Sequence, residues 1–222
     1  MMSPSVVVFD VNETLSDMAA LAPRFAEIGA PEQLAKLWFA TVLRDGFALT
    51  AAGSMEQFGR IGQGSLRQLF GDIALNRDLD TAVEHIMAGL MALPLHPDVA
   101  DGVRALRRAG LRLVTLSNGS AQVAEELLRA AGVRDQFEAL LSVEDAGMWK
   151  PARVAYEHAG HACGTVLADM LLVAAHPWDI DGASRAGMST AWVNRSGSSY
   201  PDYFAAPTHA VSSLLDLPAA LA

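Results

Sequence analysis

One short apolar run opens the chain and is followed by a long stretch without any other strand-like run. Ser5–Phe9 is rich in β-branched residues and stops at Asp10, which is typical of a buried strand. From Met18 to about Met91, Ala, Leu, Met and Gln recur at helical spacing instead. Three breaks predict three to five helices here: Ala30-Pro31, Ala52-Gly53-Ser54 and the Gly59–Gly64 cluster.

After Leu93-Pro94 the pattern changes to strands and helices in alternation. The expected strands are Leu111–Leu116, Glu138–Val143, Met170–Ala175 and Thr190–Val193. The expected helices are Asp98–Ala109, Ala121–Ala131, Ala152–Ala162 and a turn that opens at Gly182–Ala186. Apolar strands without polar alternation, separated by helices, are typical of a parallel sheet covered on both faces. We therefore expect an α/β fold with a doubly wound parallel sheet in residues 1–16 and 94–222, and an inserted all-helical domain in residues 17–93.

Composition limits the class of partner. Of 222 residues, 16 are Lys or Arg and 25 are Asp or Glu, which gives a formal net charge of −9. That acidic balance argues against nucleic-acid and anionic-membrane surfaces, which need clustered basic residues. The apolar runs are too short for a membrane span, and no basic region precedes the first run, so no signal peptide is expected. The single Cys163 allows no internal disulfide and fits a reducing cytosol, so a cytoplasmic location is expected.

Polar side chains follow four of the predicted strands at the point where each strand ends. They are Asp10-Val11-Asn12-Glu13-Thr14, Ser117-Asn118-Gly119, Trp149-Lys150-Pro151 and His176-Pro177-Trp178-Asp179. In an open parallel sheet, ligands bind beyond the carboxyl ends of the strands. Each element alone could be a helix cap or a solvated loop residue. Because four elements converge on one edge, the sequence predicts a single functional site there.

The same motifs, with Tyr156 at a matching distance from Lys150 and the closing Trp192-Val193-Asn194-Arg195, resemble a known family. The chain resembles the haloacid dehalogenase superfamily and, within it, the L-2-haloacid dehalogenase (type II) branch, over nearly its whole length. The resemblance implies a Rossmann-like core with a helical cap inserted after the first motif. This agrees with the helical segment and the alternating strands and helices described above. It also suggests a homodimer.

The residue two positions after Asp10, which the resemblance implies is the nucleophile, separates the branches of this superfamily. Its phosphatases use Asp-x-Asp, in which the second Asp protonates the leaving group, and they hold Mg²⁺ through the first Asp and acidic residues after the fourth strand. Here Asn12 cannot act as an acid, and His176 and Pro177 stand where phosphatases commonly place acids. The cysteine and the six histidines also lack zinc-ligand spacing. These features favour dehalogenation without a metal or other cofactor; the alternatives are a superfamily phosphatase and a degenerate, non-catalytic member.

The resemblance implies a covalent mechanism on a small anionic 2-haloacid. Asp10 attacks C2 of a short 2-haloalkanoic acid with inversion, and water then hydrolyses the aspartyl ester to release a 2-hydroxy acid. Lys150 would be the counter-charge of Asp10, Thr14 would support Asp10, and Asp179 would position water. The residues expected to bind the substrate and the halide are Val11 and Asn12 through their main-chain N–H groups, Arg44, Ser117, Asn118 and Tyr156.

The chain departs from the branch pattern in two motifs. Asn12-Glu13 replaces Tyr-Gly after the nucleophile, and Ala174 and His176 replace a serine and an asparagine in the fourth motif. The Ala174 side chain can neither donate nor accept a hydrogen bond. His176 can replace the asparagine as a hydrogen-bond donor or act as a base, or it can be a buried structural histidine. In this family an arginine of the cap faces the halide, and Arg44 is its best match here. The alternative interpretation is that Arg44 is an exposed arginine on a helix.

Overall fold

The computed structural model describes residues 4–222, so the first three residues of the predicted core segment 1–16 lie outside the described residues. Across residues 4–222, six strands form one parallel sheet in the order β3-β2-β1-β4-β5-β6. Their bounds are Val6–Phe9 (β1), Arg112–Ser117 (β2), Ala139–Ser142 (β3), Met170–Ala174 (β4), Ser189–Val193 (β5) and His209–Val211 (β6). The strand order changes direction between β1 and β4, which makes the carboxyl ends of these two strands the expected ligand crevice.

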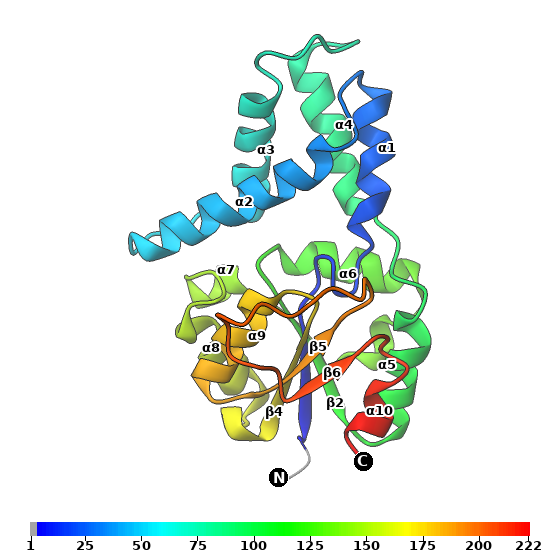
Figure 1. Ribbon diagram of the computed structural model, residues 1–222, viewed down its shortest axis with the longest axis vertical. Helices are drawn as coiled ribbons and strands as arrows, with labels where there is room; N and C mark the ends of the chain where they lie inside the picture. Colours follow the sequence, from blue (N-terminus) through cyan, green and yellow to red (C-terminus); the bar gives the residue numbers. More distant parts are fainter. Residues whose placement is uncertain (1–3) are drawn as a thin grey trace.

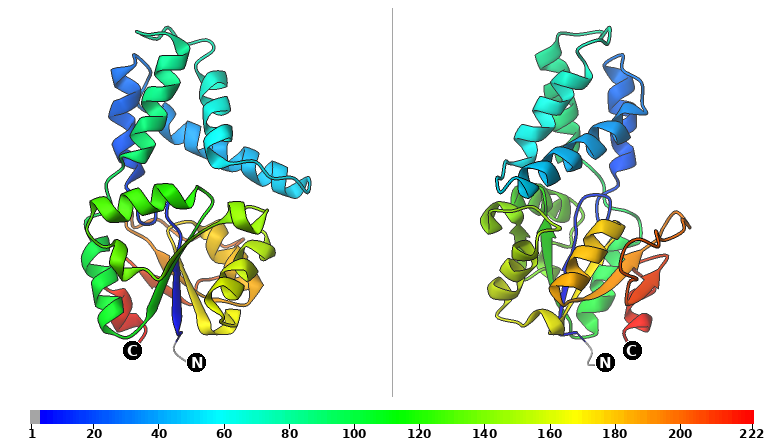
Figure 2. Two further views of the ribbon diagram at one scale, coloured as in Figure 1. Left: turned by 180° about the vertical axis from the view of Figure 1, so that it is seen from behind. Right: turned by 60° about the vertical axis from the view of Figure 1, so that its left-hand side comes forward.

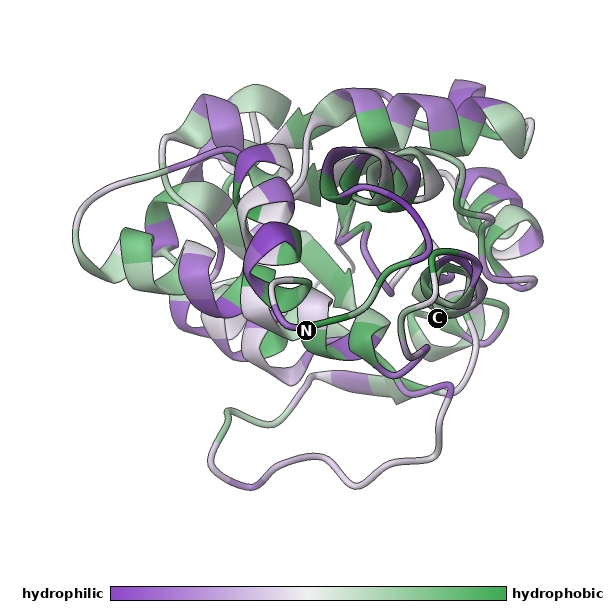
Figure 3. Ribbon diagram, turned by 90° about the horizontal axis from the view of Figure 1, so that it is seen from above, coloured by the Kyte–Doolittle hydropathy of each residue, from purple (hydrophilic) through white to green (hydrophobic). Residues whose placement is uncertain are grey.

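Helices cover both faces of the sheet, as the two views of Figure 2 show. They are α5 (Val99–Arg108), α6 (Ala121–Ala130), α7 (Val143–Ala146), α8 (Arg153–Cys163), α9 (Pro177–Ala186) and α10 (Leu217–Ala220), with short 3₁₀ turns at Arg134–Gln136 and Leu167–Asp169. Every residue of β1 and β4 is buried, which explains why these strands lack polar alternation. Hydrophobic residues concentrate in the sheet, between helices whose outer turns are more hydrophilic (Figure 3). The predicted α/β fold with a doubly wound parallel sheet is confirmed.

The segment between β1 and α5 is helical and lies above the carboxyl edge of the sheet (Figure 1). It consists of a 3₁₀ turn at Met18–Leu21 and helices α1 (Ala22–Glu27), α2 (Leu34–Ala51), α3 (Phe58–Leu69) and α4 (Leu79–Met91), which we call the cap helices. An isolated antiparallel bridge between Ser16 and Leu95 joins its two connections to the sheet. The division into residues 1–16 and 94–222 and residues 17–93 stays a prediction, with which these helix bounds agree.

The Gly59–Gly64 cluster is not a helix break, because α3 runs through it. Gly62 permits α2 and α3 to approach closely: a Cβ atom at this position would lie 3.3 Å from the Trp38 ring. The indole Nε1 of Trp38 also donates to the Gly62 carbonyl over 3.0 Å. Gly62 therefore serves helix packing rather than helix termination.

One other expectation about element bounds is wrong, and one strand was not predicted at all. Helix α9 begins at Pro177 and not at Gly182, because a proline at the first helical position loses no intrahelical hydrogen bond. Strand β6 was not expected, since a three-residue strand at the sheet edge leaves too little pattern to detect. Within residues 4–222, no helix is long and apolar enough to cross a membrane.

Candidate active site

Asp10 is the first residue after β1 and is held by the chain that follows it. Its N–H donates to Val173 at the end of β4 over 3.0 Å, and the residue is only 3% exposed. The chain then turns back through Glu13, whose φ of +61° is left-handed. This turn brings the Thr14 hydroxyl within 2.6 Å of Asp10 Oδ2, while Thr14 Oγ1 accepts the N–H of Ala175 over 2.9 Å. Thr14 thus ties the carboxylate to the end of β4.

Lys150 is completely buried and bridges two carboxylates. Its Nζ lies 3.0 Å from Asp10 Oδ1 and 2.5 Å from Asp179 Oδ2. The Asn118 side chain fixes the loop that carries this lysine, since its Oδ1 accepts the Lys150 N–H over 2.9 Å and its Nδ2 donates to the Lys150 carbonyl over 3.3 Å. Asn118 was expected to meet the halide, but its contacts in the structure are with the Lys150 main chain.

Asp179 lies in the first turn of α9 and is also fully buried. The Tyr156 hydroxyl donates to Asp179 Oδ1 over 2.7 Å, so the tyrosine orients this carboxylate, and its expected part in binding the substrate stays a prediction. Gly182 makes room for this contact, because a Cβ atom there would lie 2.5 Å from the Tyr156 hydroxyl. Burial raises the pKa of Asp179 above its usual range, although the Lys150 ammonium opposes this shift.

The remaining predicted binding groups lie at the same edge of the sheet. Val11, Asn12 and Ser117 are all buried, and Ser117 Oγ accepts the N–H of Gly119 over 2.9 Å. In the part of the chain that the structure describes, no hydrogen bond uses the main-chain N–H of Val11 or Asn12. Two donors therefore remain for an anionic oxygen beside Asp10.

His176 lies between two carboxylates. Its Nδ1 is 3.1 Å from Asp10 Oδ2, and its Nε2 is 2.8 Å from Glu13 Oε2. The ring stacks on Trp178, with 5.1 Å between ring centroids, and its centroid lies 6.2 Å from that of Phe39. Burial favours the neutral ring, but the hydrogen bonds to Asp10 and Glu13 outweigh burial and raise the pKa of His176 to about 9. His176 is therefore an imidazolium at neutral pH.

The two cations decide the charge of Asp10. Burial disfavours its ionised form, but the Lys150 ammonium and the hydrogen-bonded His176 prevail and lower the pKa of Asp10 far below its usual range. The pKa of Lys150 is in turn raised, because Asp10 and Asp179 outweigh the effect of burial. Asp10 is thus a buried carboxylate that stays ionised.

Arg44 does not lie in this site, contrary to the expectation from the sequence. Its Nε pairs with Asp45 Oδ1 over 2.8 Å, and its side chain is 67% exposed. The α2 residues that face the site are Phe39 and Phe47, the second with its ring centroid 4.9 Å from that of Trp178. Five residues turn a helix by about 140°, so Phe39 and Arg44 point in different directions. The rings of Phe39 and Phe47, and not the Arg44 guanidinium, contact the site from α2.

This arrangement gives a prediction for Arg44. We expect Arg44→Ala to leave kcat/KM for halide release within about two-fold of the parent value, because an exposed ion pair contributes little. Phe39→Ala, which removes a ring against His176, should reduce kcat/KM more. A loss of about ten-fold or more in Arg44→Ala would show that this side chain reaches the substrate after all.

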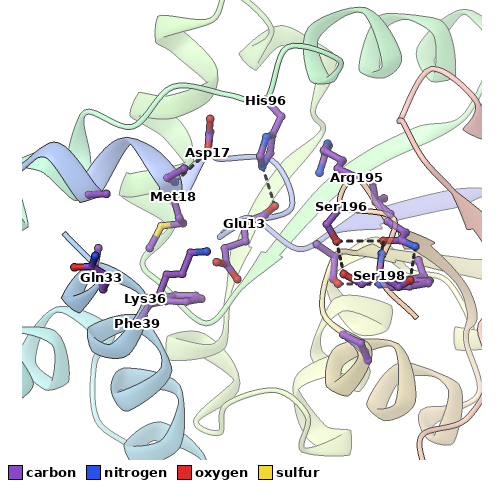
Figure 4. A pocket seen from close by; sticks show the side chains of 18 of the residues that line it. Glu13, Asp17, Met18, Gln33, Lys36, Phe39, His96, Arg195, Ser196 and Ser198 are labelled. Atoms are coloured by element: carbon purple, nitrogen blue, oxygen red, sulfur yellow. Dashed lines mark hydrogen bonds between the residues drawn. The ribbon is translucent and has the colours of Figure 1, made fainter. Parts of the chain in front are cut away.

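A cavity of about 760 Å³ lies beside the site, between α2 and the loop after β5 (Figure 4). Glu13 and Lys36 both point into it, and Phe39, His96 and Arg195 also line it. Since Glu13 and Phe39 both contact His176, the cavity extends as far as the partners of this histidine. From the sequence, Glu13 is only a departure from the branch pattern, and nothing in the motif predicts its contact with His176. The one hint in the sequence is that His176, its partner in the structure, departs from the pattern as well.

The fold and site define a hydrolase class, and comparison with known proteins identifies it. The pattern of haloacid dehalogenase-like hydrolases matches residues 4–187, so the chain belongs to this family. It is 31% identical to the (S)-2-haloacid dehalogenase of Pseudomonas sp. (strain YL), over 94% of this chain and 90% of that protein. It is 29% identical to haloacetate dehalogenase H-2 of Moraxella sp. (strain B), over 92% of each.

A solved structure agrees with these two relatives. The L-2-haloacid dehalogenase from Xanthobacter autotrophicus, with chloropropionic acid covalently bound, superposes with a TM-score of 0.87 at 26% identity over 97% of both chains. The protein accordingly lies in the L-2-haloacid dehalogenase branch of the family.

Proposed function

We propose that the protein hydrolyses the carbon–halogen bond of short 2-haloalkanoic acids, through an ester on Asp10, to give 2-hydroxy acids with inverted C2. The observation that carries this proposal is the ionised, buried Asp10 carboxylate beside Lys150. Relatives named (S)-2-haloacid dehalogenase, and a neighbour structure with chloropropionic acid covalently bound, support the same chemistry. A carboxylate kept charged in a buried site is a competent nucleophile toward carbon.

In the first step Asp10 attacks C2 in line with the departing halide. The free N–H groups of Val11 and Asn12, with Ser117, would bind the substrate carboxylate. The rings of Phe39 and Trp178 would form the apolar wall around the alkyl group. A halide leaves as an anion, so this step needs no proton donor, in keeping with Asn12 at the position of the phosphatase acid.

In the second step water attacks the ester carbonyl of Asp10. Asp179 would accept the proton of this water, because its raised pKa brings it closer to the range of an effective base. Tyr156 fixes one of its oxygens and Lys150 the other, which orients the carboxylate toward Asp10. The lysine then stabilises the charge that develops on the Asp10 carbonyl oxygen.

The donor set fits a metal-free reaction better than a magnesium-dependent phosphatase. The oxygens of Asp10 contact an ammonium on one side and an imidazolium on the other, so positive charge already occupies both sides of the carboxylate. Among residues 4–222, no cluster of three or more His, Cys, Asp or Glu side chains is arranged to hold a metal ion. Mg²⁺ requires oxygen ligands, and the two cations that already contact the Asp10 oxygens would repel a metal ion there.

Halide release with and without a chelator tests the proposal. We expect L-2-chloropropionate and short haloacetates to release halide at the same rate in EDTA and in Mg²⁺, because no step needs a metal. p-Nitrophenyl phosphate, assayed in parallel, should release no phosphate. Loss of halide release on chelation, or phosphate release that depends on Mg²⁺, would contradict the proposal and favour the phosphatase.

A further inference from the structure

Glu13, His176 and Asp10 form a continuous chain of hydrogen bonds that the two steps above do not use. The imidazole is 3.1 Å from the nucleophile at Nδ1 and 2.8 Å from Glu13 at Nε2. The side chain of Asp10 is 5% exposed, whereas that of Glu13 is 43% exposed and lines the 760 Å³ cavity. The imidazole therefore connects the buried nucleophile to a carboxylate at the cavity wall.

The backbone at Glu13 also requires an explanation. Its φ of +61° places a non-glycine residue in the left-handed region, at a cost of about 1 kcal/mol or more. Such costs persist where the side chain has a role that the surrounding structure supports. The role visible here is the contact with His176, and both residues are departures from the branch pattern.

Ester hydrolysis creates a need for an acid at this place. When the bond between Asp10 Cγ and the ester oxygen breaks, the 2-hydroxy acid leaves as an alkoxide, a strong base that must take up a proton. Lys150 contacts Oδ1 of Asp10, whereas His176 contacts Oδ2. Thr14 also contacts Oδ2, but an aliphatic hydroxyl is a far weaker acid than an imidazolium.

We propose that His176 is the general acid that protonates the oxygen leaving from the Asp10 ester, and that Glu13 is a positioning residue that keeps His176 charged. This inference rests on the proposed function and assigns Oδ2 as the oxygen that attacks C2. In the second step water adds to Cγ and gives one proton to Asp179. The Cγ–Oδ2 bond then breaks, its electron pair stays on Oδ2, and this oxygen takes the Nδ1 proton of His176.

The protons balance over the cycle. The water oxygen remains on Asp10, which is formed as a carboxylic acid and returns its proton to the neutral His176 at 3.1 Å. The proton on Asp179 is the one released in the net reaction, in which a 2-haloacid anion and water give a 2-hydroxy acid anion, a halide and a proton.

Glu13 matters most while the ester exists. In the free enzyme both Asp10 and Glu13 favour the imidazolium, but the ester of Asp10 carries no charge. Burial then favours the neutral ring, and Glu13 at 2.8 Å is the carboxylate that still opposes this. The rings packed on His176 from α9 and α2, Trp178 and Phe39, are uncharged.

More distant charged or titratable groups face this pair as well. Lys150 touches the opposite oxygen of Asp10, Lys36 of α2 lines the cavity with Glu13, and His96 Nε2 lies 3.1 Å from the Glu13 carbonyl. The two lysines disfavour a further positive charge on His176. The carboxylate of Glu13 is therefore needed to offset them.

Rapid-quench kinetics with L-2-chloropropionate tests the inference in three variants. In His176→Asn the ester on Asp10 should form and accumulate, because its hydrolysis slows by at least about ten-fold while its formation needs no acid. In Glu13→Gln the alkaline limb of ester hydrolysis should move to lower pH by at least about one unit, because a lower pKa removes the imidazolium earlier as pH rises. Glu32→Gln, which changes a cavity-lining carboxylate without a hydrogen bond to His176, should behave as the parent.

A nuclear magnetic resonance signal provides a readout apart from turnover. The imidazole nitrogens of His176 should be doubly protonated at pH 8 in the parent and in Glu32→Gln, and the transition should lie lower in Glu13→Gln. Parent-like ester hydrolysis in His176→Asn, failure of that variant to form the ester, or an unmoved pH limb in Glu13→Gln would each overturn the inference while the proposed function stands. If the parent protein itself forms no ester, the proposed function fails, and the inference fails with it.

Discussion

Asp10→Asn should abolish halide release, with a loss of at least about 10⁴-fold in kcat, as is typical when a covalent nucleophile is removed. An amide oxygen is a poor nucleophile, and the neutral side chain also loses its ionic contacts with Lys150 and His176. The measurement is halide release under saturating substrate, accompanied by circular dichroism to confirm the fold. Asp17→Asn is the matched control, because Asp17 caps a 3₁₀ turn and asparagine caps equally well.

A single turnover in ¹⁸O-labelled water tests the role of Asp10 further. If water attacks Cγ, the label enters the Asp10 carboxylate, and the first molecule of 2-hydroxy acid carries the original aspartate oxygen. Mass spectrometry of the peptide that contains Asp10 should then show one added ¹⁸O, and the same peptide of Asp10→Asn should show none. Label found only in the product of the first turnover would mean that water attacks C2 directly.

The sheet could be predicted from the sequence because its strands are buried on both faces. Runs such as Val6–Phe9 and Met170–Ala174 are continuously apolar, and the helices between them show their own period. The convergence of Asp10, Lys150 and Asp179 followed from one geometric fact, that parallel strands end at one edge. The edge strand β6 escaped notice because it is short.

What the sequence could not provide was the rotation of helices and the choice of hydrogen-bond partners. The face of α2 that meets the sheet is decided by packing of Phe39 and Gly46, the latter so close to Trp149 that a Cβ atom would lie 2.4 Å from its ring. That packing turns Arg44 outward. Motif positions also do not say that Asn118 holds the Lys150 main chain, or that Glu13 completes a chain through His176.

Lys150→Met should cost both activity and stability, because it removes the cation that separates two buried carboxylates. We expect kcat to fall by about 10³-fold, roughly 4 kcal/mol of barrier, since Asp10 loses its counter-charge and the ester carbonyl loses its nearest cation. The free energy of unfolding should fall by about 3–5 kcal/mol at pH 7, as when one partner of a buried ion pair is removed. Urea unfolding followed by circular dichroism measures this difference, and Lys36→Met, at an exposed lysine of α2, is the control.

The stability loss of Lys150→Met should also shrink as the pH falls. In the parent protein the depressed pKa of Asp10 means that its ionised form stabilises the fold above the usual carboxyl range, and that this contribution is lost as acid protonates it. Without the ammonium, burial is opposed less, so the pKa values of Asp10 and Asp179 rise and a proton takes the place of the lost cation. The difference in the free energy of unfolding between variant and parent should therefore narrow from pH 7 to about pH 4.5, because Asp10 of the variant binds a proton over this range that Asp10 of the parent, with its depressed pKa, does not. A gap that stays constant over this range would mean that the two carboxylates do not depend on Lys150 for their charge, and would remove the electrostatic basis for Asp10 as the nucleophile.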